Sequence, residues 1–574
     1  MVGRLASQSI RPLLLLLAAY VAIAATTQYA YFADTTGYAH NIVVFDQNQK
    51  LGAGDFWDFG HLLWRPLGWF LYKIVGGFFP YSRSGEDQLT VTALLICLSM
   101  AASLITLLLF RSLAARFLKS AWAAGFVALA FLCFHATLNY LHSGTSYMPG
   151  LMWLALALGS MLRAVETQAR KYAYLAGAGA GLAILFWLPY AVAIPGIVAA
   201  SLLWPSPPDS TLRIGERVRL AAASVASACL LAGVFFYLPI LQLHLDSPHA
   251  VKQWIDSSSH GWDQNRRVLR IFTGLPRSFV WMGDEGMLLK RYLFHDPYAH
   301  VTIPNLAGEF WPMLAFYVFA ACLVWVLWRD ALGQRMLWLL AAATVPLLLF
   351  AVFVFEPGSI ERYLPLYPFL CLAVAYVLSR GREHQWAVAA TLAFLCAVIF
   401  LNVKAMWSSS LLAAREPAIA RARSLVGKVE PHGLIALLSL RDGLYMLPSH
   451  PFDEVVRRAP LPVYDVLEPG NRRAMGWRRE FAQRAIAGFA QGCHVWVSKR
   501  LLADRPRPEW GWTEGDDPHL HWRDVPPFFS RFHYGAETGG ADGFVEMEAS
   551  ADNMKLLDQD RDQSPADKAA NSSQ

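Results

Sequence analysis

Charged side chains are scarce in this 574-residue chain. Asp, Glu, Lys and Arg together make up 16% of it, whereas about 25% is typical of soluble proteins. Hydrophobic residues make up 55%. Soluble cores cannot bury such an excess of apolar side chains, so the composition argues against a disordered chain, a collagen and a plain cytosolic enzyme. It favours a protein embedded in lipid.

Cysteine is rare, and the net charge is low. Six of the seven cysteines lie inside apolar runs, where a thiol behaves as a small hydrophobe, and only Cys493 lies outside them. An intramolecular disulfide framework outside the membrane is therefore excluded. The formal net charge of +6 is small for this length, so we expect no nucleic acid as a partner.

Long apolar runs, in contrast, are abundant. A transmembrane helix needs about 20 predominantly apolar residues. Two adjacent runs form one stretch that is too long for a single span, and Pro189 near its middle and basic residues at both flanks predict a hairpin of two short helices. In total we predict eleven spans, at about 12–33, 89–110, 121–141, 147–162, 172–187, 189–204, 218–241, 309–328, 336–355, 363–379 and 385–404.

Lys and Arg are distributed unevenly between the connections. They gather in one alternate set of loops, whereas Arg362 is the single basic residue in the short loops of the other set. By the positive-inside rule, the basic set and the N-terminus face the cytoplasm. The odd number of spans then places everything after about residue 405 outside. Fourteen of the 16 His fall on the outer side, where we expect the functional chemistry.

The N-terminal segment is open to two interpretations. Arg4 and Arg11, the run Leu13–Leu17 and small residues near Ala22 also resemble a secretory signal peptide. The apolar run continues to full spanning length, which favours an uncleaved membrane span, and cleavage is the alternative. In both cases Asp34 emerges outside.

The composition divides the chain into three parts. We predict an all-α polytopic membrane domain over 1–407, with large outer loops at 34–88 and 242–308. A soluble extracytoplasmic α/β domain is predicted over 408–550 and a disordered polar tail over 551–574. Within the soluble domain, the patterns predict helices at 416–427 and 472–491, and strands at 434–440, 462–467 and 494–499.

Directly after the first span comes a segment rich in polar and aromatic residues. It contains Asp34-Thr-Thr-Gly-Tyr38-Ala-His, then Gly54-Asp-Phe-Trp, then His61-Leu-Leu-Trp-Arg65-Pro. A carboxylate at the membrane–water boundary, near aromatic and cationic side chains, can act as a general base. The alternative for Asp34 is that it only caps a helix that begins in the loop.

A second outer segment lies between the ninth and tenth predicted spans. It reads Glu356-Pro-Gly-Ser-Ile-Glu361-Arg362-Tyr363-Leu-Pro-Leu-Tyr-Pro. Arginine is well suited to holding a phosphate through two parallel hydrogen bonds. The alternative for Arg362 is an interfacial role, in which it pairs with Glu361 or reaches toward lipid headgroups.

The order of these motifs resembles the C-type (GT-C) membrane glycosyltransferase superfamily, in particular the bacterial branch of protein O-mannosyltransferases and the lipid A aminoarabinose transferase. The resemblance covers about residues 10–405. It implies a polytopic enzyme with a large first outer loop, which takes a sugar from a polyprenyl phosphate at the outer face of the membrane and transfers it to a lipid, glycan or protein acceptor.

The resemblance also implies roles for individual residues. Asp34 matches the acidic residue that activates the acceptor or helps to bind a metal. Arg65 matches a basic residue before proline, and Arg362 with Tyr363 matches a late motif near the carrier phosphate.

Two departures from the family pattern stand beside these matches. Thr35 occupies the place of a second carboxylate in many relatives, and this weakens the case for a metal. Tyr147 stands where a further Asp is often found, and His142 is the candidate substitute.

The chemistry fits these residue types. Displacing a polyprenyl phosphate leaves negative charge on the phosphate, so Arg65, Arg362 and His61 could stabilise the leaving group, with Tyr38 and Glu361 beside the substrate. One carboxylate that deprotonates the attacking hydroxyl predicts an inverting transferase, with no covalent intermediate. No cofactor is certain. A divalent metal would need Asp34 and His or Asp residues of loop 242–308 to converge, although these spacings match no zinc signature.

Other classes of function remain open. A transporter or flippase of lipid-linked saccharides usually needs ionisable groups near mid-membrane, whereas the predicted spans contain almost none. A different membrane transferase, such as an O-antigen ligase or polymerase, and a non-catalytic relative that binds the carrier lipid are the further alternatives. Release of polyprenyl phosphate would distinguish the transferases from the rest.

Overall fold

The structure is a computed structural model of the chain. It describes residues 10–27, 33–47, 53–79, 87–206, 212–258, 270–282, 287–354, 357–381, 383–408, 420–421, 424–425, 428–430, 432–438, 463–465, 476–507, 510, 512–514, 520–540 and 542–562. Two compact units are present. The membrane unit comprises Met1–Tyr31, Tyr38–Met282 and Trp311–Ser409, and the second unit comprises Phe32–Gly37, Gly283–Phe310 and Ser410–Gln574.

Apolar helices form the membrane unit. Among the described residues, seven are long and apolar enough to cross a membrane: α6 (Asp87–Ala114), α9 (Tyr147–Thr167), α12 (Ile214–Gln242), α16 (Ile303–Trp328), α17 (Ala331–Phe353), η5 with α18 (Ile360–Ser379) and α19 (Gln385–Ser408). Shorter helices are α2 (Ile10–Thr26), α7 (Ala121–Leu132), α10 (Arg170–Phe186) and η4 (Leu188–Ala193) with α11 (Ile194–Leu203). Each of the eleven predicted spans therefore corresponds to a helix, and the predicted polytopic all-α fold is confirmed.

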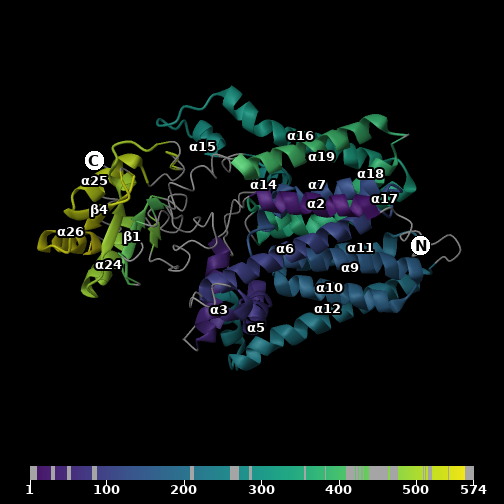
Figure 1. The fold of residues 1–574 in the computed structure, drawn as a ribbon, viewed down its shortest axis with the longest axis horizontal. Coiled ribbons are helices and arrows are strands. Elements are labelled where there is room, and N and C mark those ends of the chain that lie inside the picture. Colours follow the sequence, from purple (N-terminus) through teal and green to yellow (C-terminus); the bar gives the residue numbers. More distant parts are fainter. Residues whose placement is uncertain are drawn as a thin grey trace. The chain divides into compact units, whose positions relative to one another are not determined.

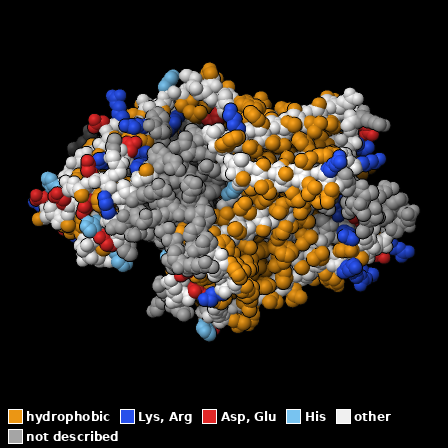
Figure 2. All heavy atoms as spheres, in the orientation of Figure 1, with side chains coloured by type: hydrophobic (Ala, Val, Ile, Leu, Met, Phe, Trp, Pro, Cys, Tyr) orange, Lys and Arg blue, Asp and Glu red, His pale blue; other side chains and the backbone are white. Residues whose placement is uncertain are grey.

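The surface of the membrane unit matches this composition. Large hydrophobic side chains such as Leu230, Leu314, Phe353 and Phe400 are exposed on α12, α16, α17 and α19. Figure 2 shows a broad hydrophobic face on the membrane unit, with Lys and Arg side chains at its end. A surface of this kind is stable in contact with lipid and not with water.

The apolar stretch around Pro189 forms two helices, as the sequence predicts. Helix α10 ends at Phe186, and Trp187 is extended before η4 begins. The start of α10 follows the end of α9 by a few residues, and Trp204 after α11 donates a hydrogen bond from Nε1 to Oε1 of Glu166 on α9, at 3.1 Å. Both ends of the stretch therefore lie at the same end of the bundle, which confirms the hairpin.

The sequence predicted one helix over 121–141, and here the structure differs. Helix α7 ends at Leu132, and a second helix, α8 (His135–Tyr140), begins after an extended residue, Phe134. The carbonyl oxygens at the break keep partners inside the protein: the Thr137 hydroxyl donates to Phe134 O at 2.9 Å, and Asn402 Nδ2 on α19 donates to Cys133 O at 2.7 Å. These bonds satisfy backbone groups that would otherwise be unpaired in lipid.

Small residues allow α10 to pack closely between two neighbours. Helices α9, α10 and α12 run side by side in Figure 1. A side chain at Gly177 would meet the backbone of Ser224 on α12, and Gly179 faces Ala157 on α9. Glycines on opposite faces of one helix thus bring three helix backbones together, as small residues commonly do in membrane proteins.

The two long loops that the sequence predicts on the outer side both contain short helices. The first loop forms α3 (Ala33–Asp46), α4 (Ala53–Phe56), η1 (Phe59–His61), α5 (Trp64–Val75) and η2 (Gly76–Phe78), and the second forms α13 (Pro248–Ser258), α14 (Arg270–Phe279) and α15 (Met287–Leu293). The loops meet where Trp254 Nε1 on α13 donates to the carbonyl of Trp57, at 2.7 Å. The ring of Phe59 lies 5.4 Å from that of Trp254.

A small mixed sheet forms the second unit, which confirms the predicted α/β class. Its strands are β1 (Leu434–Leu437), β2 (Val463–Asp465), β3 (Val495–Ser498), β4 (Tyr534–Thr538) and β5 (Phe544–Met547), in the order β2-β1-β3-β5-β4. The pairs β1/β2 and β1/β3 are parallel, and β3/β5 and β4/β5 are antiparallel. Helices of this unit include α24 (Trp477–Ala490), η7 (Lys499–Leu502), η9 (Trp522–Asp524), α25 (Val525–Ser530) and α26 (Ala551–Asp562).

The sequence-based elements of this unit are mostly present. Strands β1, β2 and β3 and helix α24 lie at the predicted positions, whereas β4 and β5 were not anticipated. Most of the helix predicted at 416–427 lies outside the described residues. The prediction of disorder from 551 onward is wrong for 551–562, because α26 buries Leu557 in the core formed with Phe481 of α24.

Part of the second outer loop belongs to this unit. Arg291 at the end of α15 donates from Nη2 to the carbonyl of Trp512, at 3.3 Å, and Nε of Arg291 lies 3.9 Å from Oδ2 of Asp296. Both charged side chains are buried, and Tyr298 packs against the hydrophobic core of the unit. The segment is therefore held by a buried ion pair as well as by apolar contacts.

Candidate functional site

Asp34 lies in the first turn of α3, where a carboxylate interacts favourably with the positive end of the helix dipole. Its side chain is exposed, and the residue groups with the second unit. The other residues predicted for the site belong to the membrane unit.

Arg65 on α5 is held in a buried ion pair. Its Nη1 lies 3.0 Å from Oδ2 of Asp58, and both side chains are at most 4% exposed. Oδ1 of Asp58 accepts a hydrogen bond from the backbone N–H of Gly60, at 2.9 Å, which fixes the carboxylate at the start of η1. The Arg65 guanidinium lies over the ring of Tyr38 on α3, 4.8 Å from its centroid. Cation, carboxylate and aromatic ring thus hold the first loop together.

His61 joins this loop to the segment that precedes α9. Its Nδ1 lies 2.6 Å from Oγ of Ser146, and the imidazole is 7% exposed. The His61 ring is 5.7 Å from the ring of Tyr38 and 5.7 Å from that of Tyr147. His61 therefore lies between the aromatic residues of the first loop and those of α8 and α9.

Tyr147 is connected through Tyr140 to Glu361 and Arg362. Its ring is 4.6 Å from that of Tyr140, whose hydroxyl donates to Oε2 of Glu361 at 2.7 Å. Oε1 of Glu361 lies 3.5 Å from Nη2 of Arg362 on η5. Tyr147 and Tyr140 thus connect His61 to the segment that contains Glu361 and Arg362.

Arg362 closes the arrangement through Trp187, the extended residue between α10 and η4. The guanidinium lies 5.3 Å from the centroid of the indole, and the indole is 4.9 Å from the ring of Tyr147. We call the connected set the aromatic–ionic cluster: Tyr38, Asp58, His61, Arg65, Tyr140, Tyr147, Trp187, Glu361 and Arg362.

The cluster contains two arginines, each beside a carboxylate. Arg65 is close to its carboxylate, whereas the 3.5 Å separation of Arg362 from Glu361 is longer than a strong charge-assisted hydrogen bond. A guanidinium that lies over an indole can direct N–H groups from its edge to two oxygens at once. The planar fork of the Arg362 guanidinium therefore has a geometry that suits a phosphate.

His142 and Tyr363 have different surroundings from the cluster. Nε2 of His142 lies 3.0 Å from Oγ1 of Thr27, whose hydroxyl donates to Ile23 O, so the imidazole must donate from Nε2. Burial lowers the pKa of His142 to about 4 and keeps the ring neutral. Tyr363 donates to the carbonyl of Pro357 at 2.6 Å and braces its own loop.

Five of the eight residues predicted for the site are thus in one cluster: Tyr38, His61, Arg65, Glu361 and Arg362. Sequence reasoning missed Asp58, Tyr140, Tyr147 and Trp187 as members, and it noted Tyr147 only as a departure from the family pattern. Asp58 stands seven residues before Arg65 in the same segment, and this short separation could have indicated the ion pair. No pattern in the sequence indicated that Tyr140 contacts Glu361, because 221 residues separate them.

The sequence left open whether a divalent metal is bound by converging His, Asp and Glu side chains. In the part of the chain that the structure describes, no group of three or more His, Cys, Asp or Glu side chains is placed to hold a metal ion. The convergence of ligands that a divalent metal would require is therefore not found among those residues.

The fold and the cluster together define a polytopic membrane protein with a buried group of aromatic and ionic side chains between its long loops and helix ends. No protein-family model and no curated protein sequence matches the chain. Among solved structures, the crystal structure of ArnT from Cupriavidus metallidurans bound to undecaprenyl phosphate matches with a TM-score of 0.50 and 14% sequence identity, over 95% of this chain and 99% of that one. The apo structure of the same ArnT matches with a TM-score of 0.46 and 14% identity, over 95% and 98%.

The undecaprenyl phosphate-bound structure shows that this chain has an ArnT-like fold. The resemblance that the motifs indicated is thereby confirmed at the level of the fold.

Proposed function

We propose that this protein is a membrane glycosyltransferase that moves a sugar from a polyprenyl-phosphate carrier to a lipid, glycan or protein acceptor at the extracytoplasmic face. The observation that carries the proposal is the aromatic–ionic cluster, which joins His61, Arg65 and Arg362 from distant parts of the chain. The ArnT structure of the same fold was solved with undecaprenyl phosphate bound, and a carrier of that chemistry fits the cluster.

The cluster residues act on the leaving group in this proposal. When the bond between the anomeric carbon and the phosphate oxygen breaks, the electron pair remains on the phosphate. Arg362 and His61 stabilise the charge that develops there, and the Arg65–Asp58 pair holds Tyr38 in place beside them. The rings of Tyr147 and Trp187 offer apolar faces for the sugar.

Asp34 is the general base of the proposed mechanism. Its carboxylate takes the proton of the acceptor hydroxyl as the oxygen attacks the anomeric carbon from the side opposite the phosphate. This single displacement inverts the anomeric centre and forms no covalent bond between sugar and enzyme. The exposure of Asp34 is compatible with this role, because the acceptor must reach it.

Release of free polyprenyl phosphate tests the proposal. The purified full-length protein is incubated in detergent with polyprenyl-phosphate sugars and candidate acceptors, and we expect release that depends on both. Asp34→Asn should lower the rate about 10²- to 10⁴-fold, the usual contribution of a general base. Asp246→Asn, a change at an exposed aspartate of the second outer loop, is the matched control and should leave the rate unchanged.

A second pair of variants tests the role of the cluster. Arg362→Gln should lower the turnover number about 10²- to 10³-fold, as the loss of one charge-stabilising donor does in other enzymes. Arg335→Gln, at an exposed arginine of α17, is the control. Full activity of both Asp34→Asn and Arg362→Gln would refute the proposed mechanism.

The same assay separates the alternatives. A flippase would move the lipid-linked saccharide between leaflets without releasing polyprenyl phosphate, and a non-catalytic relative would bind the carrier without turnover. Nuclear magnetic resonance of the product would report the anomeric configuration. Retention of configuration would contradict direct displacement.

A further inference from the structure

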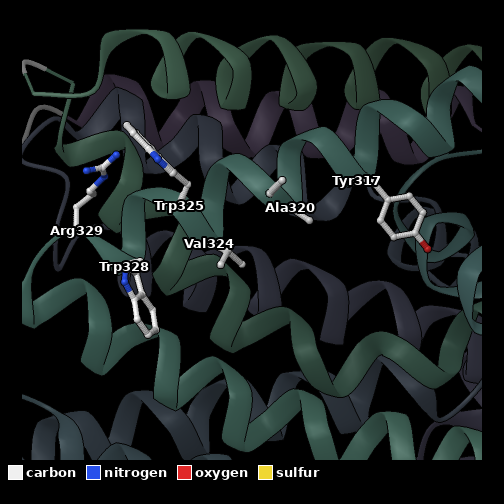
Figure 3. Close-up of a pocket in the computed structure, with 7 residues that line it drawn as sticks. Tyr317, Ala320, Val324, Trp325, Trp328 and Arg329 are labelled. Atoms are coloured by element: carbon white, nitrogen blue, oxygen red, sulfur yellow. The ribbon is translucent and has the colours of Figure 1, made fainter.

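Helix α16 carries a hollow of about 690 Å³ along its outer surface, lined by Tyr317, Ala320, Ala321, Val324, Trp325, Trp328 and Arg329. We call it the α16 groove. Figure 3 shows Tyr317 at one end, Trp325, Trp328 and Arg329 at the other, and Ala320 and Val324 between them. The groove exists because small side chains lie between large aromatic ones. Its lining is almost entirely apolar, so it suits a hydrocarbon chain.

The groove ends at a cation. The Arg329 guanidinium lies 4.2 Å from the centroid of the Trp325 ring, and its side chain is exposed. Trp386 and His384 also lie against Trp325, with ring centroids 4.6 Å and 5.2 Å away. Tryptophan rings and an arginine at the end of an apolar helix are the features that membrane proteins place at the level of lipid headgroups.

The neighbouring acidic residue does not neutralise Arg329. The single Tyr376 hydroxyl donates to the Asp330 carboxylate and lies 2.6 and 2.5 Å from its two oxygens, and Oδ2 lies 3.1 Å from Nη2 of Arg380. Asp330 also caps α17 through the backbone N–H groups of Leu332 and Gly333. Within the described part of the chain, Arg329 has its cation–π contact and no ion pair.

The length of the groove matches one leaflet. From Tyr317 to Arg329 there are twelve residue steps, or about 18 Å along a helix at 1.5 Å per residue. Half of a hydrocarbon core of about 30 Å is about 15 Å. One acyl chain can therefore follow the groove while its headgroup reaches Arg329.

The cationic end is remote from the aromatic–ionic cluster. Arg380, which pairs with Asp330 beside Arg329, follows the last turn of α18, whereas Arg362 lies in η5 before the first turn. Thirteen residues of α18 separate these ends by about 20 Å. A lipid whose phosphate contacts Arg329 is therefore a different molecule from a donor bound at Arg362.

We propose that the α16 groove binds an anionic phospholipid, with one acyl chain along Ala320, Ala321 and Val324 and the phosphate at Arg329. The site is independent of the glycosyltransferase activity proposed above. It would anchor α16 to the leaflet at the Lys- and Arg-rich end of the bundle, where anionic lipid attracts basic residues.

Native mass spectrometry of the full-length protein tests the site. The protein in detergent is titrated with phosphatidylglycerol or with phosphatidylcholine of the same chain length. We expect phosphatidylglycerol to bind about fivefold more tightly, as one basic residue near anionic lipid would provide. Arg329→Gln should abolish this preference, and the control Arg335→Gln should preserve it.

A second variant tests the hydrocarbon part of the site. Ala321→Trp fills the groove at an exposed position and should weaken binding of both lipids. Val318→Trp, at another exposed position on α16 that does not line the groove, should weaken neither.

Three results would overturn the proposal: equal affinity for both lipids, an unchanged preference in Arg329→Gln, or tighter Arg329-dependent binding of polyprenyl phosphate than of phosphatidylglycerol. The last result would assign the groove to the carrier lipid. Failure of sugar transfer in the assay of the previous section would leave these binding results unaffected, so the two proposals fail separately.

Discussion

Breaking the buried ion pair between Asp58 and Arg65 should be among the most damaging single changes in the membrane unit. Both side chains are almost fully buried, at 1% and 4% exposure, and the charged atoms are 3.0 Å apart. Asp58→Asn keeps the shape of the side chain but leaves the guanidinium without its carboxylate. Removing one partner of a buried pair costs about 3–5 kcal/mol, because the remaining charge is uncompensated.

The double variant separates the charge effect from packing. In Asp58→Asn combined with Arg65→Met, no charge remains in the site, so we expect most of the loss to be recovered. A coupling free energy of about 2 kcal/mol or more between the two changes is the expected result. The measurement is the free energy of unfolding in mixed detergent micelles, followed by the loss of helical circular dichroism.

The matched control is the pair between Lys73 and Asp46 in the same loop. These charged atoms are 2.8 Å apart, but the side chains are 52% and 21% exposed. Exposed pairs contribute about 0–1 kcal/mol, so Lys73→Gln should be nearly neutral. If Asp58→Asn costs no more than Lys73→Gln, or if the double variant is as unstable as the sum of the single ones, the argument from burial is refuted.

Three further predictions follow from burial and close packing. The pKa of His142 is about 4 in the folded protein and near 6.5 in the unfolded chain. The contribution of His142 to the free energy of unfolding is therefore complete above pH 6.5 and is lost as the pH falls toward 4. Thermal midpoints of the wild type should drop more between pH 7 and pH 4.5 than those of His142→Gln. Gly274→Ala should destabilise the protein by more than about 2 kcal/mol in denaturant unfolding, since a Cβ there meets the carbonyl of Pro357, and stability equal to the wild type would show that this close approach relaxes at little cost. Leu557→Ala in the full chain should cost about 2–5 kcal/mol and speed proteolysis of the second unit, whereas resistance equal to the wild type would show that α26 adds little.

The spans were predictable because lipid imposes one rule on every segment. A run long and apolar enough to cross the membrane must pair its own backbone groups, so it forms a helix. The break after Leu132 was not predictable, because the carbonyl of Cys133 is satisfied by Asn402, a partner 269 residues away. The sequence around Cys133 does not indicate that Asn402 donates to its carbonyl.

The site was predictable in part, from the predicted topology and from residue type. Tyr38, His61 and Arg65 share one outer loop, and Arg362 is the lone cation of the short outer loops, so topology and residue type indicated them. Trp187 depends on long-range contact to reach Arg362, and no local pattern marks it. Helix α26 was missed because its composition is polar and only a few positions, such as Leu557, face the core.

The composition of the second unit bears on how such proteins can be divided and recombined. Three separate stretches of chain contribute to it: Phe32–Gly37, Gly283–Phe310 and Ser410–Gln574. Arg291 reaches the carbonyl of Trp512, and Tyr298 completes the apolar core, so the last stretch alone lacks part of its interior. A C-terminal segment exchanged between relatives would have to bring its own partner loop from between α14 and α16. Exchange of the C-terminal segment alone should therefore leave the core of this unit incomplete.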